Sequence, residues 1–424
     1  MNAIKAALLA AVLIIGAVSG CVGNGKETEF SNAGFDVEFL VNGAENASVV
    51  SGEIAEFSFK TNLQNAAVLL PPSFLVIEGE KIIYSATVNF SSGEAKFKAL
   101  VPPTGRKFDL TVTNGEASKT LKLETVNGSS PLVSGSKIME MEKHVTSTYL
   151  LRITGSPTLE LYKVYLKTIL ESYGLEVHLT PVESGDGRTL LNLVAYHWGA
   201  SDKDWIVIGG HADTAFEITI EGVYDNTAGT VTVLELARVL SQYKFDNTIV
   251  FGLWGGEEEG LWGSKFFVDN IPQDVKVEAY LNFDMVGINW PGPAPLHEYM
   301  ACSNASSIKK MVGFGKFVTH DVCGFPETKG AFEIKKDSLG RSDHVRFADA
   351  GIPSFMFIGE LDNYPYYHTP DDTLANMIEY MGGEEMLVKG FAVPAWIGFY
   401  NTVFIDNNRF LEMGWDGGEE EDDD

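Results

Sequence analysis

Residues 205–213 read WIVIGGHAD, a short apolar run that leads directly into a histidine and an aspartate. The run is too short for a typical helix and is typical of a buried strand. Two later apolar runs, at 248–251 and 279–281, are likewise followed by acidic residues. In open α/β sheets, ligands collect at the carboxyl ends of such strands. We therefore expect the polar side chains after these runs to meet at one edge of a parallel sheet.

The side chains that follow these runs have the chemistry of a metal site. His211 brings one imidazole, Asp225, Glu258 and Asp284 bring carboxylates, and His368 comes later in the chain. Nitrogen and oxygen donors of this kind suit zinc or a similar divalent ion. The sequence therefore indicates a metal-dependent hydrolase.

The pattern of the chain divides it into two folded regions. Residues 34–126 contain short runs in which apolar and polar residues alternate, with turn residues at roughly ten-residue spacing, which predicts a small all-β sandwich. Residues 127–141 are expected to be a linker. Strands and helices alternate over 142–412, which predicts an α/β domain whose mixed, largely parallel sheet is flanked by helices. The Pro- and Gly-rich stretch 288–304 is expected to be a long loop near the site.

The clearest local signals belong to one helix and the strand expected after it. Ser156 is suited to cap the helix, Pro157 suits the first helical position, and Gly174 is expected to end it. The first apolar run after this helix, at 190–195, predicts the next strand.

Composition limits the class of partner. The chain has 424 residues, of which 45% are hydrophobic, so it is long enough for two or three domains with full cores. Its 31 basic and 58 acidic residues give a net charge of −27, which argues against nucleic acid because binding a polyanion needs clustered Lys and Arg. Residues 413–424 are expected to be a solvated acidic tail without chemistry.

The amino-terminal region resembles an export signal. Residues 1–21 resemble a lipoprotein signal that ends at Cys21, the expected site of lipid attachment, and 22–33 are expected to be a tether. The alternative is an uncleaved membrane helix. Both interpretations place the rest of the chain outside the cytoplasm, attached to the cell membrane. Cys302 and Cys323 then either form a disulfide or remain two buried thiols.

Six motifs occur in an order that resembles a known enzyme family. They are His211-Ala212-Asp213, Asp225-Asn226-Thr227-Ala228-Gly229, Glu257-Glu258-Glu259-Gly260-Leu261-Trp262-Gly263-Ser264, Asn282-Phe283-Asp284-Met285-Val286-Gly287, Ser342-Asp343-His344 and Tyr367-His368-Thr369-Pro370-Asp371-Asp372-Thr373. Over roughly residues 142–400 the chain is similar to the di-zinc aminopeptidases of metallopeptidase family 28. That family includes bacterial leucyl-type aminopeptidases and glutamate carboxypeptidase. The resemblance implies the zinc exopeptidase fold and does not extend to the β-sandwich.

The resemblance implies two Zn²⁺ ions per chain. Asp225 would bridge them, His211 and Asp284 would complete one site, and Glu258 and His368 would complete the other. Bridging needs an anion with two oxygens, which an aspartate has and an imidazole lacks. Two metals about 3.5–4 Å apart hold a hydroxide and stabilise the oxyanion of the reaction.

The resemblance also implies a general base, and this sequence offers three consecutive glutamates. Spacing from the following Gly-Leu-Trp-Gly-Ser motif selects Glu257 as the base and Glu258 as the ligand, and leaves Glu259 as a bystander. Successive side chains at a strand end point in opposite directions, so adjacent glutamates can serve metal and water separately. The family also commonly has a cis peptide after the bridging aspartate, so we expect one at Asp225-Asn226.

Four further residues stand near the expected site. Asp213 is suited to accept the second imidazole N–H of His211 and so to fix its tautomer. Tyr367 either donates a hydrogen bond to the oxyanion, as in several relatives, or merely packs there. Arg341 either contacts substrate or forms a structural ion pair. His344 is expected to be structural.

The leading hypothesis is a zinc-dependent aminopeptidase that hydrolyses N-terminal residues from peptides with a free amine. A carboxypeptidase of the glutamate carboxypeptidase type is the enzymatic alternative, and it needs clustered cations to hold a terminal carboxylate. A catalytically silent binding protein on the same fold is the third possibility.

Overall fold

The computed structural model describes residues 35–45, 48–215, 220–288, 298–302, 305–325, 334–336, 340–359 and 364–408. It divides into two compact units, one made of Met1–Gly79 and Ile83–Pro131, the other of Glu80–Ile82 and Leu132–Asp424. The predicted signal, tether and acidic tail lie outside the described residues. Among the residues that are described, no helix combines the length and apolarity needed to cross a membrane.

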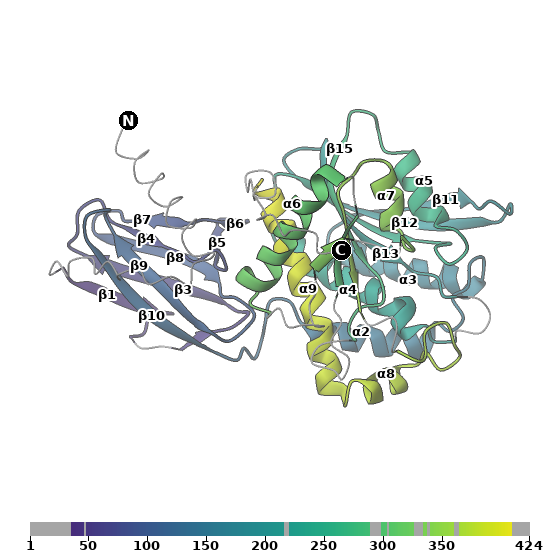
Figure 1. The fold of residues 1–424 in the computed structure, drawn as a ribbon, viewed down its shortest axis with the longest axis horizontal. Helices are drawn as coiled ribbons and strands as arrows, with labels where there is room; N and C mark the ends of the chain where they lie inside the picture. Colours follow the sequence, from purple (N-terminus) through teal and green to yellow (C-terminus); the bar gives the residue numbers. More distant parts are fainter. Residues whose placement is uncertain are drawn as a thin grey trace, which may run out of the picture. The chain divides into compact units, whose positions relative to one another are not determined.

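The first unit is built from two five-stranded sheets (Figure 1), which confirms the predicted all-β architecture. One sheet has the strand order β1-β3-β8-β5-β6 and the other has the order β2-β10-β9-β4-β7. The strands are β1 Val37–Val41, β2 Val49–Val50, β3 Ile54–Thr61, β4 Ala67–Leu69, β5 Leu75–Glu78, β6 Lys81–Tyr84, β7 Thr87–Asn89, β8 Glu94–Leu100, β9 Lys107–Thr113 and β10 Ser118–Val126.

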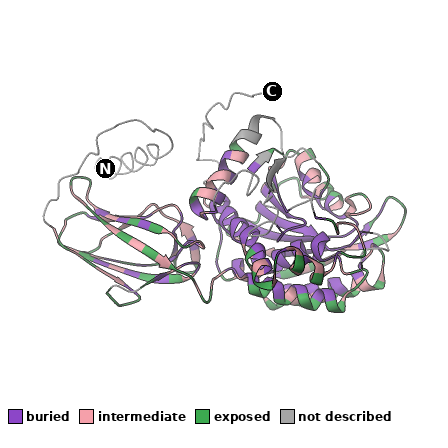
Figure 2. Cartoon of the chain, turned by 60° about the horizontal axis from the view of Figure 1, so that its bottom comes forward, coloured by how far each residue is buried: buried purple, intermediate pink, exposed green. Residues whose placement is uncertain are grey.

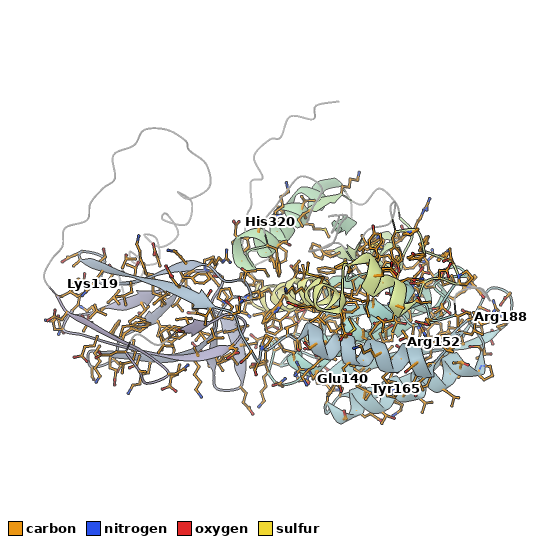
Figure 3. All side chains as sticks on the ribbon, turned by 90° about the horizontal axis from the view of Figure 1, so that it is seen from below. Lys119, Glu140, Arg152, Tyr165, Arg188 and His320 are labelled. Carbon is orange, nitrogen blue, oxygen red and sulfur yellow. The ribbon has the colours of Figure 1, made fainter. Side chains whose placement is uncertain are left out.

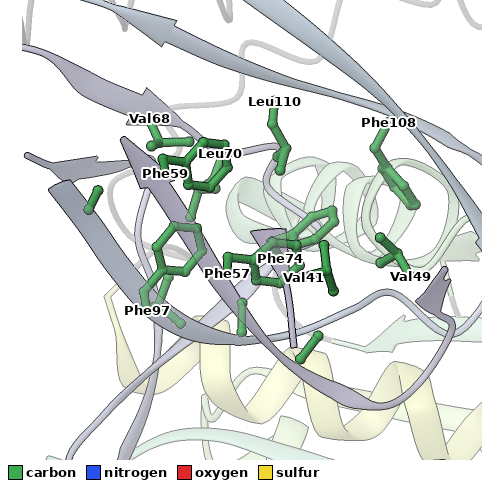
Figure 4. Packing of buried hydrophobic residues seen from close by; sticks show 14 of the residues in the cluster. Val41, Val49, Phe57, Phe59, Val68, Leu70, Phe74, Phe97, Phe108 and Leu110 are labelled. Atoms are coloured by element: carbon green, nitrogen blue, oxygen red, sulfur yellow. The ribbon is translucent and has the colours of Figure 1, made fainter. Parts of the chain in front are cut away.

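Strand alternation builds the core of this unit. In β3, Phe57 and Phe59 are fully buried, whereas the residues between and beside them are more exposed. Phe57 stacks on Phe97 of β8 with ring centroids 5.3 Å apart and contacts Phe74 edge-on at 5.9 Å. Figure 4 shows these rings together with Phe108 in one aromatic cluster. The alternating pattern of the sequence therefore corresponds to a real apolar face.

The second unit contains one eight-stranded sheet with the order β11-β12-β14-β13-β15-β18-β16-β17. Its centre, β14-β13-β15-β18, is parallel, and antiparallel strands flank it on both sides. This confirms the predicted mixed α/β sheet. The strands are β11 Glu176–Glu183, β12 Thr189–His197, β13 Asp204–His211, β14 Thr248–Trp254, β15 Lys276–Phe283, β16 Glu298–Cys302, β17 Ile334–Lys336 and β18 Ser354–Ile358.

Helices cover this sheet, and Figure 2 shows its central strands as buried. The helices are α2 Gly135–Thr148, α3 Pro157–Ser172, α4 Ala228–Leu240, α5 Trp262–Asp269, α6 Ala305–Lys316, α7 His344–Asp349, α8 Leu374–Tyr380 and α9 Glu384–Asp406. Phe283 of β15 lies beside Gly398 of α9, whereas Tyr280 of the same strand stacks on Phe347 of α7. Residues three apart on a strand face opposite sides, so α9 and α7 cover opposite faces.

The local helix signals are confirmed. The hydroxyl of Ser156 accepts the backbone N–H of Leu159, Pro157 is the first residue of α3, and Gly174 follows the helix with φ +83°. The predicted strand at 190–195 lies within β12.

Three expectations about element boundaries are wrong. The strand β11 precedes β12 and was not predicted, because an edge strand pairs on one side only, needs no apolar run and tolerates Pro181. The helix α2 begins at Gly135, inside the supposed linker 127–141. The stretch 288–304 contains β16, which is held by antiparallel pairing with β18, while 289–297 and 303–304 lie outside the described residues.

The end of α9 supplies a pH-dependent contribution to stability. Burial raises the pKa of Asp406 to about 6, although its carboxylate accepts the N–H of Asn247 at 2.7 Å. The folded protein therefore holds this proton more tightly than the unfolded chain, so the contribution falls as pH rises from about 4 to about 6 and is constant above.

We expect Asp406→Asn to remove this pH dependence, because an amide does not titrate. Urea unfolding at pH 4 and pH 7.5 should show the variant gaining about 1–3 kcal/mol relative to wild type at the higher pH. An equal difference between variant and wild type at both pH values would contradict the prediction.

Candidate metal centre

The predicted ligands gather at the carboxyl ends of three neighbouring strands. His211 is the last residue of β13, and Asp284 follows the last residue of β15. Glu257 and Glu258 lie in the turn after β14. Asp225 lies in the irregular turn Val223–Thr227 that leads into α4.

Asp225 occupies the centre of the site, with one carboxylate oxygen on each side. Its Oδ1 lies 3.1 Å from Nε2 of His211, and its Oδ2 lies 2.9 Å from Nε2 of His368. Nε2 of His211 is also 3.3 Å from Oδ1 of Asp284, and Nε2 of His368 is 3.2 Å from Oε2 of Glu258. The side chains therefore form two groups that share one aspartate.

The donor atoms within each group lie within 4.8 Å of one another, which is compact enough to surround one ion. We call His211, Asp225 and Asp284 the first group, and Asp225, Glu258 and His368 the second group. Glu257 lies in a further cluster with His211 and Glu258. The structure thus brings together all five predicted ligands and the predicted base.

Burial gives this cluster unusual electrostatics. Burial, followed by the charge of Asp225, raises the pKa of Glu258 to about 8, and burial raises the pKa of Glu257 well above its usual range. Desolvation alone lowers the pKa of His368, but the carboxylates of Asp225 and Glu258 outweigh it and raise that pKa to about 10. The site therefore contains more buried carboxyl groups than positive charges to balance them, and a bound cation would supply the missing positive charge.

The donor set fits divalent zinc. Nε2 of His368 is buried and within 3.2 Å of two carboxylate oxygens, yet it lacks hydrogen-bond geometry to them, and Oε1 of Glu258 is buried without a hydrogen-bond partner among the described residues. Buried polar atoms left in this way are costly unless another partner satisfies them. Imidazole nitrogens and carboxylate oxygens are donors that Zn²⁺ takes.

The carboxylate of Asp213 holds the turn that carries Glu257 and Glu258. The predicted hydrogen bond from His211 goes to the main-chain oxygen of Asp213 and not to this carboxylate. Nδ1 of His211 lies 3.1 Å from the main-chain oxygen of Asp213 but 3.7 Å from its carboxylate. The carboxylate instead accepts the backbone N–H groups of Glu257 and Glu258, each at 3.3 Å. A fully buried carboxylate needs donors, and two consecutive N–H groups of the turn supply them.

Glu259 turns away from the metal groups and pairs with Arg188. Nη1 of Arg188 donates to Oε1 of Glu259 at 3.1 Å, and its Nη2 contacts Oε2. Figure 3 labels Arg188 among the side chains of this unit. We expected Glu257 and Glu258 to lie at a strand end, where successive side chains point in opposite directions. This expectation is wrong, because β14 ends at Trp254 and both residues lie in the turn that follows it.

Tyr367 lies beside the second group. Its ring stacks on that of His368, with centroids 3.9 Å apart. Burial and the nearby carboxylates raise the pKa of Tyr367, so its hydroxyl keeps its proton and can donate it in a hydrogen bond. The oxyanion role of Tyr367 stays a prediction.

Arg341 is exposed, and His344 is buried as the first residue of α7. Cys323 is fully buried, which fits both alternatives for Cys302 and Cys323, a disulfide or two buried thiols.

Arg152 is an organising residue that the sequence did not reveal. It is fully buried, and its guanidinium donates to the carbonyl oxygens of Tyr149, Glu221 and Gly222 at 2.8, 2.9 and 3.1 Å, and to the hydroxyl of Thr227. Arg152, which is labelled in Figure 3, therefore fixes both ends of the turn that carries Asp225. One arginine in a loop has no distinctive sequence signal.

Asp372 supports the same turn from the opposite direction. Its carboxylate accepts the backbone N–H groups of Tyr224 and Asp225 at 3.0 and 3.2 Å. The Asp225-Asn226 peptide bond is cis, as predicted. Asp372 belongs to the last motif, four residues after His368, so the motif supplies both a predicted ligand and the support for the turn of Asp225.

We expect Asp372→Asn to weaken this turn, because an amide offers one acceptor oxygen where the carboxylate offers two. Burial raises the pKa of Asp372 to about 7, so the group is not fully charged at neutral pH, and loss of one of its hydrogen bonds costs about 0.5–1.5 kcal/mol. Urea unfolding in the presence of chelator measures this loss without a metal contribution.

The neighbouring Asp371→Asn is the matched control, because Asp371 is exposed. It should change the free energy of unfolding by less than about 0.5 kcal/mol. Equal effects of the two substitutions would contradict the role of Asp372.

Comparisons with known proteins agree with this geometry. The model of Peptidase family M28 matches residues 192–385. Leupeptin-inactivating enzyme 1 of Streptomyces exfoliatus is 34% identical over 193 residues, which cover 45% of this chain and 40% of that protein. Aminopeptidase YwaD of Bacillus subtilis is 33% identical over 180 residues, 41% of this chain and 36% of that protein. The chain thus matches about two fifths of the length of these curated relatives.

Solved structures show the same fold. LapB from Legionella pneumophila superposes with a TM-score of 0.54 at 22% sequence identity. The superposition covers 65% of this chain and 72% of the LapB chain. BSAP, a zinc aminopeptidase from Bacillus subtilis, gives a TM-score of 0.52 at 18% identity and covers 63% of this chain and 95% of that one. Residues 192–385 therefore match Peptidase family M28, and the α/β unit that contains them has the fold of these solved structures.

Proposed function

We propose that this chain is a zinc-dependent aminopeptidase that holds two Zn²⁺ ions and removes N-terminal residues from peptides. The observation that carries the proposal is the position of Asp225, whose two oxygens face His211 and His368 at 3.1 and 2.9 Å. A carboxylate between two donor groups is the arrangement that a two-metal site needs.

The residues of the site have distinct tasks. His211, Asp225 and Asp284 would hold one ion, and Glu258 and His368 would join Asp225 to hold the other. Bound zinc would polarise the peptide carbonyl and make a hydroxide available at neutral pH.

Two residues act beside the ligands. Glu257 accepts the proton of the attacking water and passes it to the leaving amine. Its backbone is fixed by the carboxylate of Asp213 at 3.3 Å, so the base is held in place while the proton moves. Tyr367 donates a hydrogen bond to the oxygen that becomes negative.

Charge favours the amino end of a peptide over the carboxyl end. Asp213, Asp225, Glu257, Glu258 and Asp284 place five carboxyl groups at or beside two imidazoles. Two Zn²⁺ ions would balance four of these negative charges, and the negative charge that remains favours the cationic α-amine of a substrate over a terminal carboxylate.

Binding a terminal carboxylate would need free cations, and the described arginines around the site offer few. Arg188 is paired with Glu259, and Arg346 donates to the carbonyl of Gly260 at 3.0 Å. Arg341 is exposed, but one arginine is not the cluster of cations that a terminal carboxylate needs. A carboxypeptidase is therefore the weaker alternative.

The decisive experiment compares two glutamates of the same turn, Glu257 and Glu259, which differ in environment. Glu257→Gln should lower kcat on aminoacyl p-nitroanilides by about 10²–10⁴-fold, because the base is lost while the ligands remain. Glu259→Gln should change kcat by no more than about threefold, because Glu259 pairs with Arg188 outside the metal groups.

Metal and substrate controls complete this test. Chelator should abolish turnover and added zinc should restore it, and acetylation of the substrate amine should prevent cleavage. Cleavage of amine-blocked peptides would indicate a carboxypeptidase. Binding of less than one zinc per chain, with no turnover of any substrate in a panel, would favour a silent binding protein.

We also propose that the chain works outside the cytoplasm, tethered through a lipid on Cys21. The support is the apolar stretch that ends in Ser-Gly-Cys. Mass spectrometry of the mature amino terminus should find a diacylglyceryl group on Cys21, and an intact residue 1 would favour the membrane-helix alternative.

A further inference from the structure

A continuous line of hydrogen bonds runs through the interior of the α/β unit and ends on a predicted metal ligand. Nε1 of Trp254 donates to the hydroxyl of Tyr280 at 2.7 Å, and that hydroxyl donates to Oδ1 of Asn282 at 2.7 Å. Nδ2 of Asn282 donates to the hydroxyl of Ser342 at 2.8 Å, which donates to Oδ2 of Asp284 at 2.6 Å. We call these five residues the donor chain.

The chemistry of its two ends fixes the direction of the donor chain. An indole N–H only donates, and a carboxylate only accepts. The hydroxyl groups of Tyr280 and Ser342 must therefore both donate towards Asp284, and the amide of Asn282 has one orientation. Every member is at most 4% exposed, so water does not compete for these bonds.

The sheet is built to let this line pass. Trp254 is on β14 and Tyr280 on β15, and β13 lies between these two strands. A Cβ atom at Gly209 of β13 would lie 2.5 Å from the backbone oxygen of Gly252, 3.1 Å from Nε1 of Trp254 and 3.2 Å from the hydroxyl of Tyr280. The missing side chain lets two strands that are not neighbours share a hydrogen bond across the central strand.

The donor chain divides the two oxygens of Asp284 between two tasks. Ser342 occupies Oδ2, whereas Oδ1 lies 3.3 Å from Nε2 of His211 within the first group. The partner of a ligating carboxylate sets its orientation and its basicity. Consecutive hydrogen bonds that point the same way also strengthen one another.

We propose that Trp254, Tyr280, Asn282 and Ser342 are positioning residues that hold Asp284 as a one-oxygen ligand and set the metal affinity of the first group. This inference rests on the proposed two-metal function. Of the proposed ligands, the donor chain includes only Asp284, which belongs to the first group. The zinc affinity of the first group therefore depends on the donor chain more strongly than the zinc affinity of the second group.

The test measures metal binding and does not use turnover. Zinc affinity is measured by competition with a chelating dye, and Co²⁺ absorption spectra report the ligand geometry. Ser342→Ala removes the last donor, and Tyr280→Phe removes an inner hydroxyl but keeps the ring that stacks on Phe347. Tyr173→Phe, at the carboxyl end of α3, controls for loss of a phenol hydroxyl.

Each substitution is also made in two single-group backgrounds. In His368→Ala the remaining tight site is the first group, and in His211→Ala it is the second. We expect Ser342→Ala to weaken zinc binding about 10–100-fold in the first background and less than threefold in the second. Tyr280→Phe should cause a smaller loss with the same preference, and Tyr173→Phe should cause none.

The outcomes separate this inference from the proposed function. If wild type binds two zinc ions and the substitutions weaken both groups equally or neither, the donor chain is only structural. If wild type binds no zinc tightly, the two-metal function fails and this inference fails with it. Melting temperatures in excess chelator identify a misfolded Ser342→Ala, in which case Tyr280→Phe decides the question.

Discussion

The need to hold several carboxyl groups in a buried space is the constraint on which the site depends. Asp225 is 3% exposed and stands between two imidazoles, with further carboxylates on both sides. Like charges at such distances repel strongly once water is removed. The surrounding structure must therefore fix each side chain, and the fold supplies that restraint mainly through backbone N–H groups and buried polar side chains.

The supports come from distant parts of the sequence and converge on two turns. Asp372 and Arg152 hold the turn that carries Asp225, one by accepting its N–H groups and the other by donating to its carbonyl oxygens. Asp213 holds the turn of Glu257 and Glu258 in the same way. The parallel strands bring these turns together, and charge-assisted hydrogen bonds then set the position of each side chain.

The sequence predicted the parts of the protein that have a repeating or local signal. Alternation identified the β-sandwich, Ser156 and Pro157 marked the start of α3, and the apolar runs marked the strands that carry the ligands. It did not predict Arg152, because contacts made by one loop residue with carbonyl groups of another loop leave no pattern. It also missed β11, because an edge strand does not require an apolar run.

The bare backbone at Gly209 shows that an absence of atoms contributes to the site as much as the ligands do. Trp254 and Tyr280 belong to strands that β13 separates, and they meet only because nothing projects from the middle strand there. A Cβ atom at this position would lie 2.5 Å from the backbone oxygen of Gly252 and would also press on these two side chains, while the proposed ligands themselves stay unchanged. Substitution of Gly209 would thus disturb the hydrogen bonds behind Asp284, although glycine has no side chain that could bind a metal.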